Sequence, residues 1–258
     1  MNGQHMILHY EQHQMATEQP VLVFIHGLFG SLSNLGMLAR AFYETHHVIQ
    51  IDVRNHGKSS HCAEMNYDAM AQDLIDTLAH LNIEDFSVIA HSMGGKIAMT
   101  LAHQVQQRLK QLIILDMSPF AYQKNHHDQI FKALFAVKNA QVQTRQDATQ
   151  IMRQHLNEEM VIQFLMKSFS QGQWLFNVDA LFTHYADILS WQPQPAWKGA
   201  SLFLRGEKSP YISAPEHFSA SDQQFPMAEI QVIEQAGHWL HAEKTALVLT
   251  AIQHFLAQ

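Results

Sequence analysis

The sequence predicts an α/β fold in which a mostly parallel central sheet is flanked by helices. Short apolar segments rich in Val, Ile and Leu alternate along the chain with longer segments of helical period. This alternation is typical of parallel strands whose connecting helices cover both faces of a sheet. It stops between residues 117 and 197, and the length of 258 residues fits one α/β domain that carries an insertion there.

Six apolar segments are expected to form the parallel strands, because each is short, rich in branched residues and bounded by polar positions. A further segment, MILHY at residues 6–10, is expected to add an antiparallel edge strand. The six segments are VLVFIH (21–26), HVIQID (47–52), FSVIAH (86–91), QLIILD (111–116), ASLFLRG (200–206) and AEIQVI (228–233).

Helices are expected between these strands. Apolar residues recur at helical spacing between Met70 and Leu81, directly after Asn66, a residue type that caps helix N-termini. A similar apolar stripe at residues 247–256 predicts a helix near the end of the sequence.

Residues 117–197 contain only helical fragments rich in Gln and aromatic residues. Eleven of the 25 aromatic residues in the chain lie between Phe120 and Trp191, more than a surface insertion needs. We expect a helical cap inserted after the sixth strand, with residues 1–116 and 198–258 forming the core. The cap is either a subdomain with its own small core or a lid that walls a substrate pocket.

The composition excludes several classes of protein. The net charge is −7, and a broad nucleic-acid interface needs clustered Lys and Arg instead. Cys62 is the only cysteine, so no intrachain disulfide is possible and a reducing compartment is expected. The sequence shows no secretory signal at its start and no apolar run of membrane-spanning length. We therefore expect a soluble cytoplasmic protein.

Ser92 is the candidate nucleophile. It lies in AHSMG (residues 90–94), between a predicted strand and a predicted helix, with small residues two positions before and two after it. A strand that turns sharply into a helix strains the serine backbone and exposes its hydroxyl at the carboxyl edge of the sheet. The pattern is weak alone, and its strand-turn-helix context makes it specific.

A serine needs a base within hydrogen-bond reach. Among the 19 histidines, His238 follows the last predicted strand and precedes the last predicted helix, which places it at the correct edge of the sheet. His241 is the alternative, but it is expected to open that helix and to have a capping or surface role.

Backbone amides are expected to bind the oxyanion. The amide of Met93 lies at a helix start, where amides are unpaired. The second donor should come from the loop after the strand at 21–26, where Gly27 and Gly30 free the backbone; Leu28 is the first candidate and Phe29 the second. The same loop lacks the glycine and lysine pattern of a phosphate-binding loop, so a nucleotide site is not expected.

Four motifs now identify a family resemblance. HGLFGS, DVRNHGKS, HSMGGK and AGHW, in this order and spacing, resemble an α/β-hydrolase-fold serine esterase, similar to small bacterial carboxylesterases related to the mammalian abhydrolase-domain proteins. The resemblance extends from Val21 through the terminal helix. It implies that Ser92 is the nucleophile and His238 the base, and that Asp52 and His56 are structural turn residues.

The acid departs from the family pattern. Most members carry an Asp shortly after the strand that follows the lid, and the equivalent slot here holds Ser209. We assign the acid to Asp116, because it ends the strand expected to lie between the nucleophile strand and the strand before Ser209. The alternatives are that Asp116 only caps a turn, or that Glu207 supplies the carboxylate; Glu207 lies early in the loop and is expected to face solvent.

The predicted function is a serine hydrolase of short- to medium-chain carboxylic esters, with thioesters as a further possibility. Acyl-CoA thioesterase, acyltransferase or carbon–carbon hydrolase chemistry on the same fold is one alternative, and a non-catalytic binding protein is another. No cofactor or metal is expected, since the histidine pairs at 46–47 and 126–127 lack Cys or carboxylate partners at ligand spacing. The expected pocket residues are Phe29, Phe120, Tyr122, Trp174, Ser209 and Trp239. The cations that could meet CoA phosphates are Lys124, Lys132, Lys138, Arg145, Arg153 and Lys167.

Overall fold

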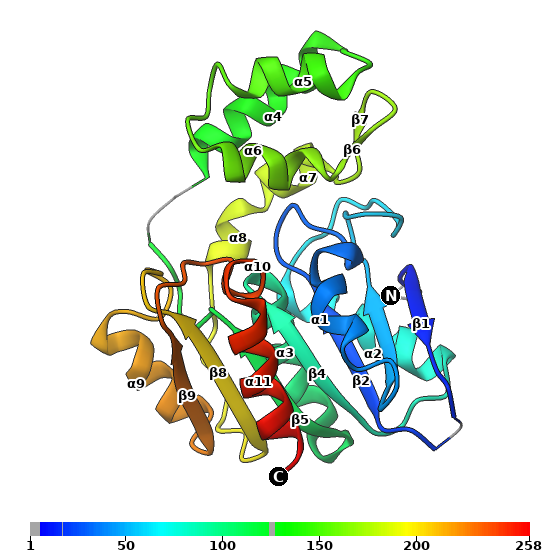
Figure 1. Ribbon diagram of the computed structural model, residues 1–258, viewed down its shortest axis with the longest axis vertical. Helices are drawn as coiled ribbons and strands as arrows, with labels where there is room; N and C mark the ends of the chain where they lie inside the picture. Colours follow the sequence, from blue (N-terminus) through cyan, green and yellow to red (C-terminus); the bar gives the residue numbers. More distant parts are fainter. Residues whose placement is uncertain (1–5, 17, 124–126) are drawn as a thin grey trace.

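A computed structural model describes residues 6–16, 18–123 and 127–258. Its main feature is a seven-stranded sheet with the order β1-β3-β2-β4-β5-β8-β9, in which β1 is antiparallel to β3 and every other neighbouring pair is parallel (Figure 1). The predicted sheet is therefore confirmed. The strands are β1 (Tyr10–His13), β2 (Val21–Ile25), β3 (His47–Ile51), β4 (Phe86–His91), β5 (Leu109–Leu115), β8 (Ala200–Gly206) and β9 (Ala228–Ile233).

The first strand lies later than residues 6–10, where it was expected. It begins at Tyr10, which pairs with Ile51 of β3. The two preceding amides are used elsewhere: Leu8 donates to the Thr77 hydroxyl at 3.0 Å and His9 to the Ser59 hydroxyl at 2.8 Å. Side chains of the core thus bind these two amides, while the His9 carbonyl accepts from the Asp52 amide, directly after β3, at 2.9 Å.

Helices cover both faces of the sheet. The helices α1 (Gly36–Arg40) and α11 (Thr245–Leu256) pack on one face and α2 (Tyr67–His80) and α3 (Met93–Val105) on the other (Figure 1). Alternate residues of the strands therefore enter two separate hydrophobic clusters, as Leu22 and Val23 do in β2. The shorter elements of the core are η1 (Leu32–Leu35), η2 (Gln106–Arg108), α9 (Pro215–Gln224) and α10 (Leu240–Glu243).

The two helices predicted in detail are present. Asn66 caps α2 by accepting a hydrogen bond from the Ala69 amide at 2.8 Å, and the buried face of α2 includes Met70 and Leu74. In α11 the buried residues are Val248, Ile252 and Phe255. No helix in the described part of the chain is long and apolar enough to cross a membrane.

The segment between β5 and β8 forms a cap over the end of the sheet from which α10 starts (Figure 1). The cap was expected after the sixth strand. It follows the fifth, β5, because only one strand, β1, comes before β2 in the chain. A two-residue strand pair interrupts the helices that were expected there. The cap elements are α4 (Asp128–Ala140), α5 (Arg145–Met152), α6 (Glu159–Met166), β6 (Phe169–Ser170), β7 (Gln173–Trp174), α7 (Val178–Thr183) and α8 (Tyr185–Leu189).

Candidate active site

Ser92 lies at the sharp turn between β4 and α3. Its backbone has φ 54° and ψ −121°, in the positive-φ region that non-glycine residues rarely adopt. The turn also demands a small residue two positions later, because a Cβ on Gly94 would lie 2.5 Å from the carbonyl oxygen of His26. The strained turn and the close approach of α3 to the end of β2 together place the Ser92 hydroxyl at the carboxyl edge of the sheet.

His238 reaches Ser92 from the loop between β9 and α10. Its Nε2 lies 2.9 Å from the Ser92 Oγ, and its Nδ1 lies 2.6 Å from the Asp116 Oδ2. The carboxylate accepts the proton on Nδ1, so Nε2 has a free lone pair for the serine proton. An imidazole oriented in this way can act as a general base.

His241, the alternative base, forms no hydrogen bond with Ser92 in the described structure, where the Ser92 hydroxyl meets His238. It is the second residue of α10, and its ring packs on that of His91 with a centroid distance of 4.4 Å. Burial lowers the pKa of His241 to about 3, so this imidazole is neutral near pH 7. His91, for which the sequence indicated no role, donates from Nε2 to the carbonyl of His238 at 2.9 Å and thereby supports the loop that carries His238.

Asp116 follows β5 and its carboxylate is fully buried. One carboxylate oxygen accepts from the Gly206 amide at 2.9 Å, and the other accepts from His238 and from the hydroxyl of Ser209. Ser209 was expected to contact substrate, but it does not line the cavity; its hydroxyl donates to the Asp116 carboxylate instead. Glu207 is exposed and accepts from the Gln235 amide at 2.7 Å.

Hydrogen bonds in the loop after β2 fix the direction of the Leu28 amide. The carbonyl of Gly27 accepts from the Gly30 amide at 3.1 Å and from the His26 Nδ1 at 2.8 Å. In a trans peptide the carbonyl and the amide point in opposite directions, so these bonds aim the Leu28 amide away from His26. The Phe29 amide is used, because it donates to the His56 Nε2 at 3.2 Å.

These bonds decide between the two candidate donors. In the described part of the chain, the amides of Leu28 and Met93 donate to no protein acceptor, and both residues line the cavity beside Ser92. Leu28 is therefore the available donor of this loop, and Phe29 is not. Unpaired amides at this position can bind a developing oxyanion.

Two buried histidines, His26 and His56, hold this loop in place. His26 accepts from the Val53 amide through Nε2 at 3.2 Å, so its proton lies on Nδ1. His56 has the same tautomer, since its Nδ1 donates to the Arg54 carbonyl at 2.9 Å. Burial lowers the pKa of both rings, to about 3 for His56, which keeps them neutral and able to accept. His26 is the first residue of the motif HGLFGS, but its role in holding the loop depends on contacts that only the fold brings together.

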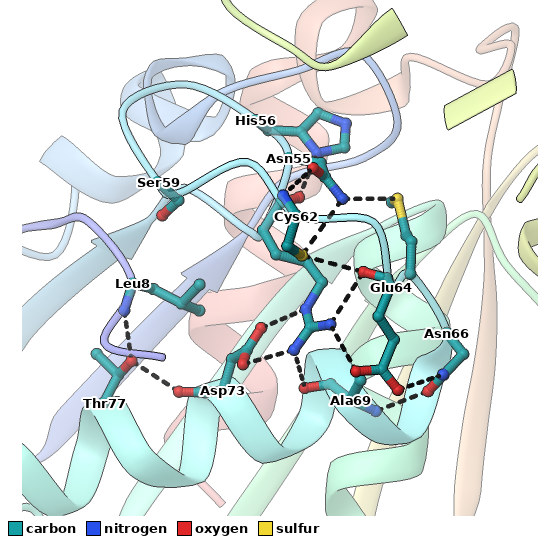
Figure 2. Close-up of polar contacts among 12 residues, drawn as sticks. Leu8, Asn55, His56, Ser59, Cys62, Glu64, Asn66, Ala69, Asp73 and Thr77 are labelled. Atoms are coloured by element: carbon teal, nitrogen blue, oxygen red, sulfur yellow. Dashed lines mark hydrogen bonds and ion pairs between the residues drawn. The ribbon is translucent and has the colours of Figure 1, made fainter. Parts of the chain in front are cut away.

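Hydrogen bonds hold the segment next to His56, and Figure 2 shows several of them. The guanidinium of Arg54 binds both carboxylate oxygens of Asp73 on α2, at 2.6 and 2.8 Å, and the carbonyl of Glu64 at 3.0 Å. Asp52 holds the same turn by accepting from the amides of Leu32 and Lys58. The structural role expected for Asp52 is therefore observed.

The cavity above Ser92 has a volume of about 70 Å³ and lies between the core and the cap. Of the aromatic residues expected there, Phe29, Tyr122 and Trp239 line it. Phe120 and Trp174 do not: Phe120 packs on the His217 ring at 4.9 Å, and the Trp174 indole donates to the Leu134 carbonyl inside the cap. The count of aromatic residues could not separate the pocket from the interior of the cap. Lining residues that sequence reasoning missed include Tyr67, Lys96, Phe164, Tyr185, Ile188 and Leu189.

Lys96 is a buried cation at the edge of this cavity. It lies four residues after Ser92 on α3, and its Nζ donates to the carbonyls of Leu189 and Ser190, each at 2.9 Å. The Tyr122 ring lies 4.9 Å from the same atom. Burial lowers the pKa of Lys96 to about 7. Lys96 therefore ties the helix that follows the nucleophile to the segment where the cap returns to the core.

The cationic residues of the cap have other contacts. Lys138 pairs with Asp179, Arg153 pairs with Glu159 at 2.8 Å, and Arg145 donates to the Phe169 carbonyl. Lys132 and Lys167 are exposed, whereas Lys124 and His126 lie outside the described residues. In the described ranges no three His, Cys, Asp or Glu side chains group as metal ligands.

The fold and this site define an α/β-hydrolase. A sequence profile of the alpha/beta hydrolase fold matches residues 20–245, and the chain belongs to this family. It is 50% identical over 235 residues to esterase YbfF of Escherichia coli (strain K12), covering 91% of this chain and 92% of that protein.

Two further comparisons agree. The chain is 35% identical over 252 residues to the sn-1-specific diacylglycerol lipase ABHD11 of Mus musculus, covering 92% of this chain and 81% of that protein. A solved marine microorganism esterase superposes with a TM-score of 0.91 at 29% identity, covering 97% and 99% of the two chains. The protein is a carboxylesterase-type hydrolase of the esterase and lipase group.

Proposed function

We propose that the chain hydrolyses short- to medium-chain carboxylic esters through an acyl-enzyme on Ser92. His238 is the general base and Asp116 the acid that orients it. One observation carries the proposal: the hydroxyl, imidazole and carboxylate form a continuous hydrogen-bonded chain, at 2.9 and 2.6 Å, beside two unpaired amides.

The reaction follows from this geometry. His238 takes the proton of Ser92 as the oxygen attacks the ester carbonyl, and the amides of Leu28 and Met93 bind the oxyanion. The imidazolium, stabilised by Asp116, then gives its proton to the leaving alcohol. Water, activated by the same imidazole, releases the acid and restores the free serine.

The substrate range rests on the cavity. It is small and lined mainly by apolar and aromatic side chains, which suits an acyl chain of modest length. Hydrolysis of acyl-CoA is the second candidate. It is less favoured, because Lys138 and Arg153 of the cap already pair with carboxylates.

A fluorophosphonate probe tests the nucleophile, since only an activated serine reacts with it. Mass spectrometry should place the adduct on the peptide that contains Ser92, and Ser92→Ala should abolish labelling. An adduct on another peptide, or none, would contradict the proposal.

A panel of p-nitrophenyl esters and CoA thioesters of graded chain length tests the substrate class. Rates should be highest for short and medium p-nitrophenyl esters. A preference for the CoA esters would select the second candidate, and faster product formation when an added alcohol accepts the acyl group would indicate an acyltransferase.

A further inference from the structure

Phe29, next to the donor Leu28, is held from two sides. Its amide donates to His56 of the core, and its carbonyl accepts from the hydroxyl of Ser168 in the cap at 3.0 Å. Between these two bonds the Phe29 backbone has φ 63°, a left-handed conformation that a phenylalanine rarely adopts. Both peptide planes of a strained residue are thus fixed by side chains from different parts of the fold.

Ser168 is itself firmly placed. It lies between α6 and β6 with 2% of its surface exposed. Its amide donates to the Leu165 carbonyl at 2.9 Å, and its carbonyl accepts from the Leu175 amide at 2.7 Å. The Ser168 hydroxyl therefore has little freedom to follow Phe29 if the loop moves.

The same edge of the cap also rests on the segment that carries His56. The backbone amide of Asn177 donates to the Asn55 carbonyl at 2.9 Å, and its side-chain amide donates to the Asn55 Oδ1 at 3.2 Å. Asn55 lies in sequence between Arg54, which binds Asp73 and Glu64, and His56 (Figure 2). The Phe29 ring packs on Phe176 of the cap with a centroid distance of 5.3 Å.

We propose that Ser168 is a positioning residue of the oxyanion hole, through which the cap fixes the direction of the Leu28 amide. The inference rests on the proposed function, because it concerns the transition state for ester hydrolysis. The bond from Ser168 keeps the Phe29 carbonyl in place, so the left-handed turn persists and the preceding amide stays aimed at the cavity. The cap then acts on the chemistry and not only on substrate entry.

The test compares Ser168→Ala with Ser221→Ala. Ser221 is also fully buried and also donates to a carbonyl, that of His217 at 3.1 Å, but it lies in α9 away from the loop. Ser168→Ala should lower kcat roughly 10-fold, less than the 10²–10³ that follows removal of an oxyanion donor, with KM nearly unchanged. Ser221→Ala should leave kcat unchanged at a similar loss of thermal stability.

A trifluoromethyl ketone, which binds serine hydrolases as a tetrahedral oxyanion, gives a second measurement. Its affinity should fall in Ser168→Ala by the same factor as kcat/KM. Ser168→Thr, which keeps the hydroxyl, should restore most of both. Ser168→Cys keeps the side-chain shape but has a weak donor, so it should behave like Ser168→Ala even if the alanine variant folds poorly.

Unchanged kcat and inhibitor affinity in folded Ser168→Ala or Ser168→Cys would overturn the inference while leaving the proposed function intact. If the unaltered protein neither hydrolyses esters nor labels at Ser92, both proposals fail.

Discussion

Three donors from two segments of the core, the end of β8 with its following loop and the loop after β9, converge on the Asp116 carboxylate, and none of them is a Lys or Arg. The Gly206 amide and the Ser209 hydroxyl stabilise the buried negative charge of the carboxylate by hydrogen bonding. The same carboxylate also accepts from His238 and thereby orients the imidazole. Asp116, the proposed acid, follows β5, one strand away from the loop that holds Ser209; because β5 lies between β4 and β8, its end opens toward the same edge of the sheet.

Asp116→Asn tests this assignment. An amide accepts less strongly from Nδ1 and can impose the wrong imidazole tautomer, so kcat should fall by roughly 10³ to 10⁴ with a modest change in melting temperature. Glu207→Gln is the control, since that carboxylate binds only the Gln235 amide in the described structure and should leave the rate unchanged. If Glu207→Gln is the damaging variant, the acid has been assigned to the wrong residue.

His56 should make stability depend on pH. Its folded pKa of about 3 lies below the ordinary value of 6.5, so the unfolded chain binds more protons between these values. The contribution of neutral His56 is complete above pH 6.5 and is lost as the pH falls toward 3. In His56→Gln, which retains an acceptor for the Phe29 amide, unfolding free energy from urea titrations should fall less between pH 7 and pH 4.5 than in the unaltered protein. His254→Gln, an exposed change on α11, should reproduce the unaltered slope.

Among the structural elements, α3 connects the nucleophile to the cap. Its first turn follows Ser92, and its Lys96 binds the carbonyls of residues 189 and 190 where the cap returns to the core. Tyr67 at the start of α2 donates to the neighbouring carbonyl of Ile188 at 2.6 Å. Three successive carbonyls are thus held by side chains of the core.

Replacing Lys96 by Met should destabilise the protein, because the half-buried Ser190 carbonyl loses its donor at a cost of about 1–3 kcal/mol, whereas the Leu189 carbonyl still accepts from the Tyr122 amide at 3.0 Å. The folded pKa of Lys96, about 7, lies below the ordinary 10.5, so the unfolded chain binds more protons between these values. Stability from this group therefore rises with pH through that window. The stability difference between the unaltered protein and Lys96→Met, measured by urea unfolding, should be larger at pH 9.5 than at pH 7. Lys132→Met, an exposed change on α4, should show no such trend.

The cap helices should divide into pocket-forming and structural positions. Phe164 of α6 lines the cavity beside Trp239, with a centroid distance of 5.7 Å, whereas Trp174 packs on Phe176 within the cap. Phe164→Ala should shift the preferred p-nitrophenyl ester toward longer chains. Trp174→Ala should lower stability by about 3–5 kcal/mol without changing that preference. The reverse pattern would place the acyl chain against the other side of the cap.

For the whole molecule, the sheet and the convergence of Ser92, Asp116 and His238 could be predicted from the sequence, because parallel strands bring their carboxyl ends to one edge. Ser92 and Asp116 each follow such a strand directly and His238 lies in the loop after another, so position in the chain was enough to place them together. The choice of Leu28 over Phe29 depends on which peptide His56 reaches, and the role of Ser168 depends on how the cap docks. Both are contacts between segments far apart in sequence that no local pattern encodes.

Cap and core are expected to unfold together, because they share one hydrophobic cluster. Ile25 and Leu74 of the core and Leu134 and Leu165 of the cap all belong to it. Removing the cap would expose apolar residues of both parts at once, which favours a single cooperative transition even in a chain of 258 residues. Urea unfolding followed by tryptophan fluorescence, to which Trp174 and Trp191 of the cap contribute, should therefore coincide with unfolding followed by far-ultraviolet circular dichroism. The rate of Ser92 labelling by a fluorophosphonate should fall over the same urea range. A fluorescence change that precedes both other signals would mean that the cap opens separately, and the oxyanion loop would then lose its contact with Ser168 before the core unfolds.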